Sequence, residues 1–388
     1  MSHARARGGR TVVERLLALV TTAALSLLLG LSPGLSAGLA PASAGGTPAR
    51  GMWDTRVFAH VQAPGYPAYA FVHRNGRVYA GTYTNPQGDH QRSRVFEWSR
   101  GGALLRSWTV PGQHLGQDHG VQVANADAHG RLVLLEKSTS SVMTLDVRTG
   151  HFRTWATLPD LPTCAPGTTG PDCSPNAVDY PAIPNYATWG PGGALYVSDY
   201  GQAVIWKIPR GSVRPRVWFA SPALDGSEFG TAGLAYRPGR RDFLVTQQST
   251  TTDGSVPTDG KLYRLPLRRS GAPGRLRTLW TSKPGDLPDG FGIARSGHVY
   301  VADAGLSNQL VELGTDGHEI ARFPQVPGAG ENGSAIPFDT PSSATFLGSR
   351  VLVANQSFFG DTSHHALLDV EVRERGRAPY LPRGAYWR

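Results

Sequence analysis

The stretch GFGIARSGHVYVA, residues 290–302, contains the pattern that decides the fold. A short apolar segment runs into a turn that contains a glycine, and a second apolar segment, Val299-Tyr300-Val301-Ala302, follows at once. Valine, isoleucine, tyrosine and phenylalanine favour strands, and a glycine turn between two such runs is typical of a β-hairpin. We therefore predict two antiparallel strands here.

The second segment of this hairpin recurs along the chain. Its copies begin 48 to 63 residues apart and are Val78–Gly81, Leu132–Leu135, Leu195–Ser198, Phe243–Thr246, Val299–Ala302 and Val351–Ala354. Each copy follows a first segment such as YATWGPGGA and precedes a third such as AVIWKI, and in most units a fourth such as PRVWFAS comes next. Four strands in a unit of about fifty residues are the signature of a β-propeller blade.

The repeat predicts an all-β protein, a six-bladed β-propeller with four-stranded blades in one domain, residues 45–388. The last unit lacks a clear fourth strand, whereas RVFAHV, residues 56–61, precedes the first blade and has strand character. We expect this N-terminal strand to fill the missing place and close the ring, which removes most free sheet edges. A two-sheet sandwich is the structural alternative, and the sixfold repeat disfavours it.

The composition agrees with this fold class. Glycine and proline together supply 78 of the 388 residues, charged residues make up only 17%, and hydrophobic residues make up 40%. The low charge excludes a coiled coil and argues against a mostly disordered chain, while the hydrophobic content is sufficient for a large core.

The N-terminal 44 residues have the features of a secretory signal peptide. Four arginines precede an apolar run at residues 16–31, helix breakers follow, and Ala42-Ser43-Ala44 supplies the small residues that a signal peptidase requires. An uncleaved membrane anchor is the alternative, but the apolar run is short for a membrane span. We expect a secreted or extracytoplasmic protein that has no membrane span after cleavage of the signal.

The net charge does not point to nucleic acid. The formal charge is +9, and removal of residues 1–44 leaves 34 basic and 28 acidic residues, a charge of +6. The arginines are scattered and form no basic stripe with interleaved aromatic residues, so nucleic-acid binding is not expected. A closed single-chain ring makes a monomer the expected state, with a small molecule as its ligand or substrate.

The chain contains two cysteines, Cys164 and Cys173, in the loop segment CAPGTTGPDC. In an exported protein, such a pair is interpreted as a local disulfide. A metal site is the alternative, but it would require further soft ligands nearby.

Candidate functional residues lie where the first strand of each unit begins, because these positions converge on the mouth of a propeller's central channel. The six triplets are Pro67-Ala68-Tyr69, Asp118-His119-Gly120, Pro184-Asn185-Tyr186, Thr231-Ala232-Gly233, Pro288-Asp289-Gly290 and Pro341-Ser342-Ser343. Asn185 and Asp289 carry oxygen ligands of the kind that calcium prefers. A role in capping turns is the alternative for both residues.

Four further residues of these triplets are candidates for the same mouth. His119 is either a general base or a hydrogen-bonded residue of the channel wall, and Asp118 adds a carboxylate. Tyr69 and Tyr186 are expected to line the cavity, where their rings either stack on a ligand or fill space.

The blade pattern with Pro288-Asp289-Gly290 and residues 297–302 resembles the SMP-30/gluconolactonase/luciferin-regenerating-enzyme superfamily. The resemblance extends over residues 56–382 and implies a six-bladed propeller. Many members of that superfamily hold one divalent metal ion at the axis and hydrolyse lactones or related esters. In them, a glutamate from the first blade, asparagines from the third and fourth, and an aspartate from the fifth bind the metal.

Carried over to this sequence, the resemblance assigns two of the four metal ligands, Asn185 and Asp289. The first-blade glutamate is replaced by Ala68 and the fourth-blade asparagine by Ala232, and alanine cannot bind a metal. Calcium is the expected cation, with Glu228 and Asp118 as auxiliary ligands. The resemblance further implies that Asp289 acts as general base or nucleophile.

Two functions therefore remain open. The first is an exported lactone or ester hydrolase, in which a cation polarises the carbonyl group and Asp289, or a water activated by Asp289 or His119, attacks it. The second is a secreted propeller without catalytic activity that binds a small molecule or a protein. The two alanines in the ligand set favour the second, while the family resemblance favours the first.

Overall fold

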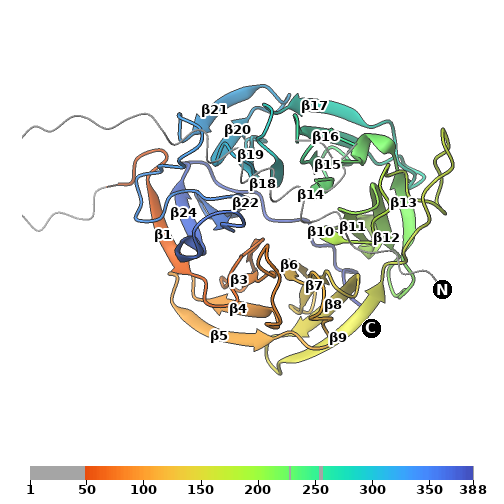
Figure 1. Ribbon diagram of the computed structural model, residues 1–388, viewed down its shortest axis with the longest axis horizontal. Coiled ribbons are helices and arrows are strands. Elements are labelled where there is room, and N and C mark those ends of the chain that lie inside the picture. Colours follow the sequence, from red (N-terminus) through yellow and green to blue (C-terminus); the bar gives the residue numbers. More distant parts are fainter. Residues whose placement is uncertain (1–48, 227–228, 253–256, 388) are drawn as a thin grey trace, which may run out of the picture.

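Six four-stranded antiparallel sheets surround a central axis (Figure 1). The structure is a computed structural model and describes residues 49–226, 229–252 and 257–387. The predicted signal peptide, residues 1–44, lies outside the described residues. The predicted fold class is confirmed, because the six sheets are the blades of a six-bladed propeller.

The first five blades follow one another along the chain, each with its four strands in sequence order from the axis outward. Blades 1 to 3 consist of β2 (Ala70–Val72), β3 (Val78–Gly81), β4 (Arg94–Trp98) and β5 (Leu104–Thr109); β6 (Val121–Ala126), β7 (Leu132–Glu136), β8 (Ser141–Asp146) and β9 (His151–Thr157); and β10 (Pro184–Trp189), β11 (Leu195–Asp199), β12 (Val204–Ile208) and β13 (Arg216–Ala220). Blades 4 and 5 consist of β14 (Thr231–Arg237), β15 (Asp242–Gln247), β16 (Lys261–Pro266) and β17 (Arg277–Thr281); and β18 (Pro288–Ile293), β19 (Val299–Asp303), β20 (Gln309–Leu313) and β21 (Glu319–Phe323).

The sixth blade takes its strands from both sides of the other five. Its inner strands are β22 (Pro341–Leu347), β23 (Arg350–Asn355) and β24 (Ala366–Glu371). Its outer strand is β1 (Thr55–His60), which pairs antiparallel with β24. The segment that precedes blade 1 in the sequence therefore lies at the rim of blade 6.

Burial falls from the axis to the rim. Every residue of β6 in blade 2 is buried, whereas every residue of β5, the outer strand of blade 1, is exposed or half-buried. The inner strands carry nearly continuous apolar runs because each blade packs on a neighbour through both faces.

The hydrophobic core is divided among the contacts between blades. Val133 of blade 2 and Trp206 of blade 3 belong to one buried cluster. Phe96 of blade 1 and Leu352 of blade 6 belong to another, so the first and last blades also pack on each other. This packing surrounds the axis with rigid strands.

Glycines shape the turns between the first and second strands of several blades. Gly76, Gly130 and Gly297 have φ angles of 82°, 84° and 101°. This left-handed region strains residues that carry a Cβ atom, and glycine adopts it without that strain. The glycine turn of the opening sequence motif is therefore a requirement of the backbone.

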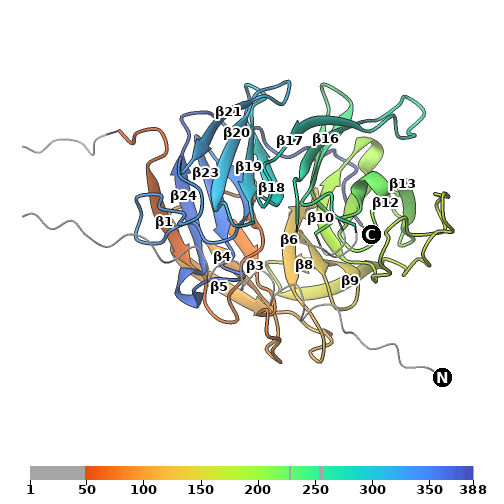
Figure 2. The same cartoon turned by 45° about the horizontal axis from the view of Figure 1, so that its top comes forward.

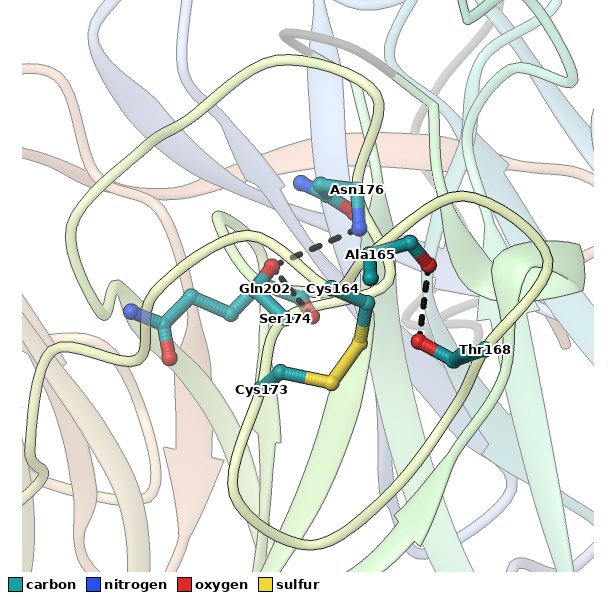
Figure 3. The surroundings of a disulfide bond; sticks show 7 residues. All are labelled: Cys164, Ala165, Thr168, Cys173, Ser174, Asn176 and Gln202. Carbon is teal, nitrogen blue, oxygen red and sulfur yellow. Dashed lines mark hydrogen bonds between the residues drawn. A yellow bond between two sulfur atoms is a disulfide. The ribbon is translucent and has the colours of Figure 1, made fainter.

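The predicted disulfide between Cys164 and Cys173 is confirmed, in the long connection between blades 2 and 3 (Figure 3). The base of its loop is anchored to blade 3, because Ser174 Oγ donates a 3.1 Å hydrogen bond to Gln202 O. The side-chain amide of Asn176 also donates to Gly201 O. The disulfide thus closes a small loop outside the ring.

The C-terminal segment, residues 375–387, crosses the centre of the ring from blade 6 toward blades 2 and 3, and we name it the C-terminal strap (Figures 1 and 2). Arg377 N donates to Ile293 O of blade 5 (2.8 Å), and Ala128 N, in the turn between β6 and β7 of blade 2, donates to Ala385 O (2.6 Å). Between these points, Tyr380 packs its ring on Tyr236 of blade 4, with the ring centroids 5.2 Å apart. The strap therefore spans one end of the central channel.

Helical structure in the described residues is confined to three short 3-10 turns, Pro191–Gly193, Pro222–Leu224 and Thr362–His364. No helix of the described chain is long and apolar enough to cross a membrane.

Candidate functional site at the ring axis

Two hydroxyl groups set the positions at which the first strands of blades 4 and 5 begin. Ser198 Oγ of β11 donates a 2.6 Å hydrogen bond to Ala232 O. Thr246 Oγ1 of β15 accepts a 2.7 Å bond from Gly233 N and donates a 2.6 Å bond to Asp289 O. Blades 3 and 4 therefore each hold the backbone of the next blade at the axis.

Asp289 is the carboxylate that this arrangement presents. Its residue is 9% exposed, and its Oδ1 atom is buried without a hydrogen-bond partner among the described residues. Burial raises the pKa of the Asp289 carboxyl well above its usual value, and hydrogen bonding by Tyr186 and Gln248 opposes the rise. Because buried acceptors are normally paired, Oδ1 marks a point at which a ligand can supply the missing donor or cation.

Asn185 is connected to a second buried group without a partner. Gln122 Nε2 donates to Asn185 Oδ1 (2.6 Å) and to Tyr83 Oη (2.9 Å), which leaves Gln122 Oε1 buried without a partner in the described residues. Burial, together with the charge of Asp289, raises the pKa of Tyr83. Tyr83, which Gln122 links to Asn185, therefore lies close enough to Asp289 to feel its charge.

Gln122 and Tyr83 were not among the residues predicted for the site. The available signal was polarity, because Gln122 and Asn125 are polar residues in a mainly apolar first strand, GVQVANA, whose residues are all buried. A buried glutamine in such a position requires hydrogen-bond partners, and these lie on blades 1 and 3.

Tyr69 and Tyr186 meet beside these polar groups. Their rings pack edge to face with the centroids 5.1 Å apart, and Tyr186 Oη donates a 2.9 Å bond to Ser342 O of blade 6. A Cβ atom on Gly290 would lie 2.2 Å from Tyr186 Oη, so the close approach requires glycine at this position. Both tyrosines line a cavity of about 280 Å³ that extends to the C-terminal strap.

His119 and Asp118 lie in contacts of their own. His119 is buried, and its two ring nitrogens face backbone carbonyls, Nδ1 that of Gln117 (2.9 Å) and Nε2 that of Gln91 (2.6 Å). Asp118 is exposed and pairs with Lys137 at 3.2 Å. These contacts fit His119 as a brace between two loops, and its Nε2 atom also lies 3.5 Å from Asp89 Oδ1.

The remaining family positions supply no side-chain ligand. Ala68 and Ala232 are both buried, and their backbone oxygens accept hydrogen bonds from Ser342 Oγ (2.8 Å) and Ser198 Oγ (2.6 Å). Glu228, an expected auxiliary ligand, lies outside the described residues.

A separate cluster of ligand-type side chains lies at the other end of blade 5. His298 Nδ1 is 2.9 Å from Glu312 Oε1 and 2.7 Å from Glu374 Oε1. The ligand atoms of these three residues all lie within 4.8 Å of one another. Tyr300 Oη also donates to Glu374 Oε1 (3.1 Å), so the cluster is already linked by its own hydrogen bonds.

No protein-family model and no curated protein matches the chain. Among solved structures, the calcium-binding protein regucalcin from Agrobacterium tumefaciens superposes with a TM-score of 0.53 at 16% identity, over 84% of this chain and 98% of regucalcin. Luciferin-regenerating enzyme gives 0.52 at 13% identity, over 82% and 96% of the two chains. A streptogramin B lyase gives 0.51 at 14% identity, over 83% and 99%. The resemblance expected from the sequence is confirmed for the fold: this chain has the six-bladed propeller of regucalcin, a member of the SMP-30 family, and of luciferin-regenerating enzyme.

Proposed function

We propose that the chain is an exported hydrolase that opens a lactone or cleaves an ester at the ring axis, with Asp289 as its central group. The observation that carries this proposal is the buried Oδ1 atom of Asp289, which has no partner among the described residues. A carboxyl whose pKa is raised by burial exchanges protons closer to neutral pH than an ordinary aspartate, as general acid–base chemistry requires.

The proposed reaction uses the Asp289 carboxylate as a proton relay. Asp289 takes a proton from a water molecule as the water oxygen forms a bond to the carbonyl carbon. The tetrahedral intermediate then expels the alkoxide oxygen, and Asp289 returns the proton to that oxygen. The products are a carboxylic acid and an alcohol, which in a lactone remain in one molecule. Tyr69 and Tyr186 would bind the apolar face of the substrate.

The axial residues fit a weakly bound hard cation. The donor set consists of oxygen atoms, and two of them, Asp289 Oδ1 and Gln122 Oε1, are buried without partners in the described part of the chain. Asp289, Asn185 and Gln122 would hold the ion, with calcium as the expected species. A bound cation would polarise the substrate carbonyl. Since Ala68 and Ala232 supply no side-chain ligand and Asp289 is the one carboxylate of this set, we expect weak affinity.

Binding without catalysis is the second candidate, and the two alanines favour it. A propeller without these ligands would still bind a small molecule in the cavity that Tyr69 and Tyr186 line, beside Asp289. In both cases we propose an exported monomer, a proposal supported by the signal-like N-terminal segment and by the disulfide between Cys164 and Cys173.

The test compares the wild-type protein with Asp289→Asn, which keeps the shape of the side chain and removes its acid–base function. Sugar lactones, aliphatic γ-lactones and p-nitrophenyl esters are assayed with and without calcium. We expect hydrolysis by the wild type and a loss of about a hundredfold or more in the variant. Asp316→Asn, which removes an exposed carboxylate from the turn between β20 and β21, is the matched control and should retain activity.

Calorimetry with calcium separates the two candidates further. Calcium binding that disappears in Asp289→Ala would support an axial ion. Equal hydrolysis by the wild type and Asp289→Asn would contradict the proposed role of Asp289. A lack of hydrolysis of every substrate, combined with ligand binding that depends on Asp289, would favour the non-catalytic propeller.

A further inference from the structure

A second, larger cavity opens at the end of the channel that the C-terminal strap spans. Its volume is about 680 Å³. The first-strand residues that line it include Val72, Ile293 and Leu347, which lie where β2, β18 and β22 end. Asp289 lies near the beginning of β18, so this cavity and the polar group around Asp289 belong to opposite ends of the first strands.

The walls of this cavity are strongly basic. Six arginines line it, and no aspartate or glutamate is among its described lining residues. The arginines come from the turns of blades 1, 5 and 6 and from the strap, and they are Arg74, Arg100, Arg295, Arg350, Arg375 and Arg377. We refer to it as the arginine cavity. Guanidinium groups gathered in one concave surface create a positive potential that attracts anions.

Two of these arginines already have partners within the protein. Arg350 forms an ion pair with Asp369, and the side chain of Arg74 donates to Ala128 O. Arg100, Arg295, Arg375 and Arg377 form no side-chain hydrogen bond or ion pair with any described residue.

Glu374 precedes Arg375 in the sequence and would be the obvious partner for these free guanidinium groups. Its carboxylate is instead engaged by His298 Nδ1 (2.7 Å), by Tyr300 Oη (3.1 Å) and by the hydroxyl of Ser296. Glu374 therefore forms no ion pair with Arg375 or with the other free arginines of the described cavity wall.

The floor of the arginine cavity is apolar and aromatic. It includes Tyr69, Phe71, Phe291 and Phe346. Arginine forks bind carboxylate and phosphate groups through two parallel hydrogen bonds, while aromatic faces pack on the apolar part of a ligand. Free guanidinium groups over an aromatic floor therefore match a ligand with both an anionic group and an apolar body.

Hydrogen bonds fix the strap backbone that carries Arg375 and Arg377 before any ligand binds. Arg295 N donates to Arg375 O (2.8 Å), and Gly376 N donates to Gly348 O (2.9 Å). A Cβ atom on Gly376 would lie 2.0 Å from the Cβ atom of Phe346, so the strap lies directly against the cavity floor. A rigid backbone at these arginines lowers the ordering cost of binding.

We propose that the arginine cavity is a binding site for a small organic anion, whose carboxylate or phosphate group is held by the free arginines and whose apolar part lies on the aromatic floor. This site shares Tyr69 with the cavity beside Asp289, but its arginines lie at the opposite end of the first strands, and the proposal does not depend on the proposed hydrolysis.

The test measures binding of four probes to the full protein by calorimetry: benzoate, phenyl phosphate, inorganic phosphate and uncharged phenol. The variant is Arg295→Gln/Arg377→Gln, which removes one arginine from blade 5 and one from the strap. Arg268→Gln/Arg269→Gln removes the same charge from an exposed turn of blade 4 and is the matched control. Arg100→Gln, on blade 1, is a second variant that leaves the strap unchanged. Thermal melts check that each variant is folded.

We expect benzoate or phenyl phosphate to bind with one-to-one stoichiometry, and the comparison of the two identifies the preferred anionic group. The Arg295→Gln/Arg377→Gln variant should weaken this binding about tenfold or more, Arg100→Gln should weaken it as well, and the control should leave it unchanged. Absence of binding by both organic anions, or an equal loss in the control, would overturn the proposal. Phenol or inorganic phosphate that binds as tightly as the organic anions would also overturn it.

Discussion

The hydroxyl of Thr246 donates a 2.6 Å hydrogen bond to the backbone oxygen of Asp289. Because Thr246 belongs to blade 4 and Asp289 to blade 5, one blade sets the place at which the next presents its buried carboxyl. Ser198 makes the same contact with Ala232 one blade earlier. The same kind of hydrogen bond therefore holds Ala232 in blade 4 and Asp289 in blade 5, and of these two residues only Asp289 carries a functional group.

Replacement of Thr246 with valine tests this relationship. Thr246→Val keeps the shape of the side chain, removes the bond to Asp289 O and leaves Gly233 N without its acceptor. We expect a loss of about 1–3 kcal/mol in the free energy of unfolding, measured by urea denaturation. Ligand binding or hydrolysis that depends on Asp289 should weaken as well.

Ser198→Ala is the control for this variant, because it removes the equivalent bond to Ala232 O. It should lower stability by a similar amount and weaken Asp289-dependent binding less than Thr246→Val, because Ser198 acts on the site only through Tyr186, whose backbone N donates to Ser198 Oγ (3.0 Å). An equal effect of both variants on Asp289-dependent binding would contradict a specific positioning role for Thr246.

The buried carboxyl of Asp199 should make the free energy of unfolding depend on pH in an unusual way. Burial raises the pKa of this carboxyl from 3.8 to about 6, although Trp206 Nε1 and backbone amides donate hydrogen bonds to it. Between these two pH values the folded state binds more protons than the unfolded state, so this group makes stability fall as the pH rises. The stabilising contribution is fully present below about pH 4 and is lost as the pH passes 6. Its size is about 3 kcal/mol.

The measurement compares urea denaturation of the wild type and Asp199→Asn from pH 4 to 7. From pH 4 to 6 the free energy of unfolding of the wild type should fall relative to that of the variant. The substitution itself also changes stability, but by an amount that does not depend on pH. Asp146→Asn provides a control, since hydrogen bonding from Arg148 lowers the pKa of the half-buried Asp146 below 3.8. Its contribution to stability is lost only as the pH falls below 3.8, so the difference between the wild type and Asp146→Asn should stay nearly constant from pH 4 to 7. If the wild type and Asp199→Asn differed in free energy of unfolding by the same amount at every pH, the raised pKa would be contradicted.

The disulfide should contribute to stability without affecting the axial site. Cys164 and Cys173 are separated by nine positions, and closure of such a short loop stabilises a protein by about 2–3 kcal/mol in the chain-entropy view. The Cys164→Ser/Cys173→Ser variant should therefore unfold at lower urea concentration. Binding at Asp289 should not change, because the loop is anchored outside the ring, on Gln202. A loss of axial binding in a folded variant would contradict this separation.

The strands of the fold could be predicted from the sequence, because each inner strand is a nearly continuous apolar run between turns. The six quoted second strands all lie within β3, β7, β11, β15, β19 and β23. Residues 56–61 were expected to form a strand, and the structure has β1 at Thr55–His60.

The side-chain network of the site was harder to predict. The bond between Gln122 and Asn185 joins residues 63 positions apart on different blades, and such a contact depends on how the blades face one another. The strap was missed for a different reason. Its residues carry no strand periodicity, and their contacts are made with five of the six blades rather than with neighbours in sequence.

Gly290 provides the sharpest test of the packing beside Asp289. A Cβ atom there would lie 2.2 Å from Tyr186 Oη and 2.8 Å from the Cβ atom of Ser343, so Gly290→Ala must displace one or both of them. We expect a loss of about 1–3 kcal/mol in the free energy of unfolding and weaker binding at the axis, measured by urea denaturation and calorimetry. In the Tyr186→Phe background the hydroxyl is absent, so the added methyl group should cost less. Ser343 remains in place, which makes the expected rescue partial. Equal costs of Gly290→Ala in the two backgrounds would mean that the Tyr186 hydroxyl does not limit the space at the axis.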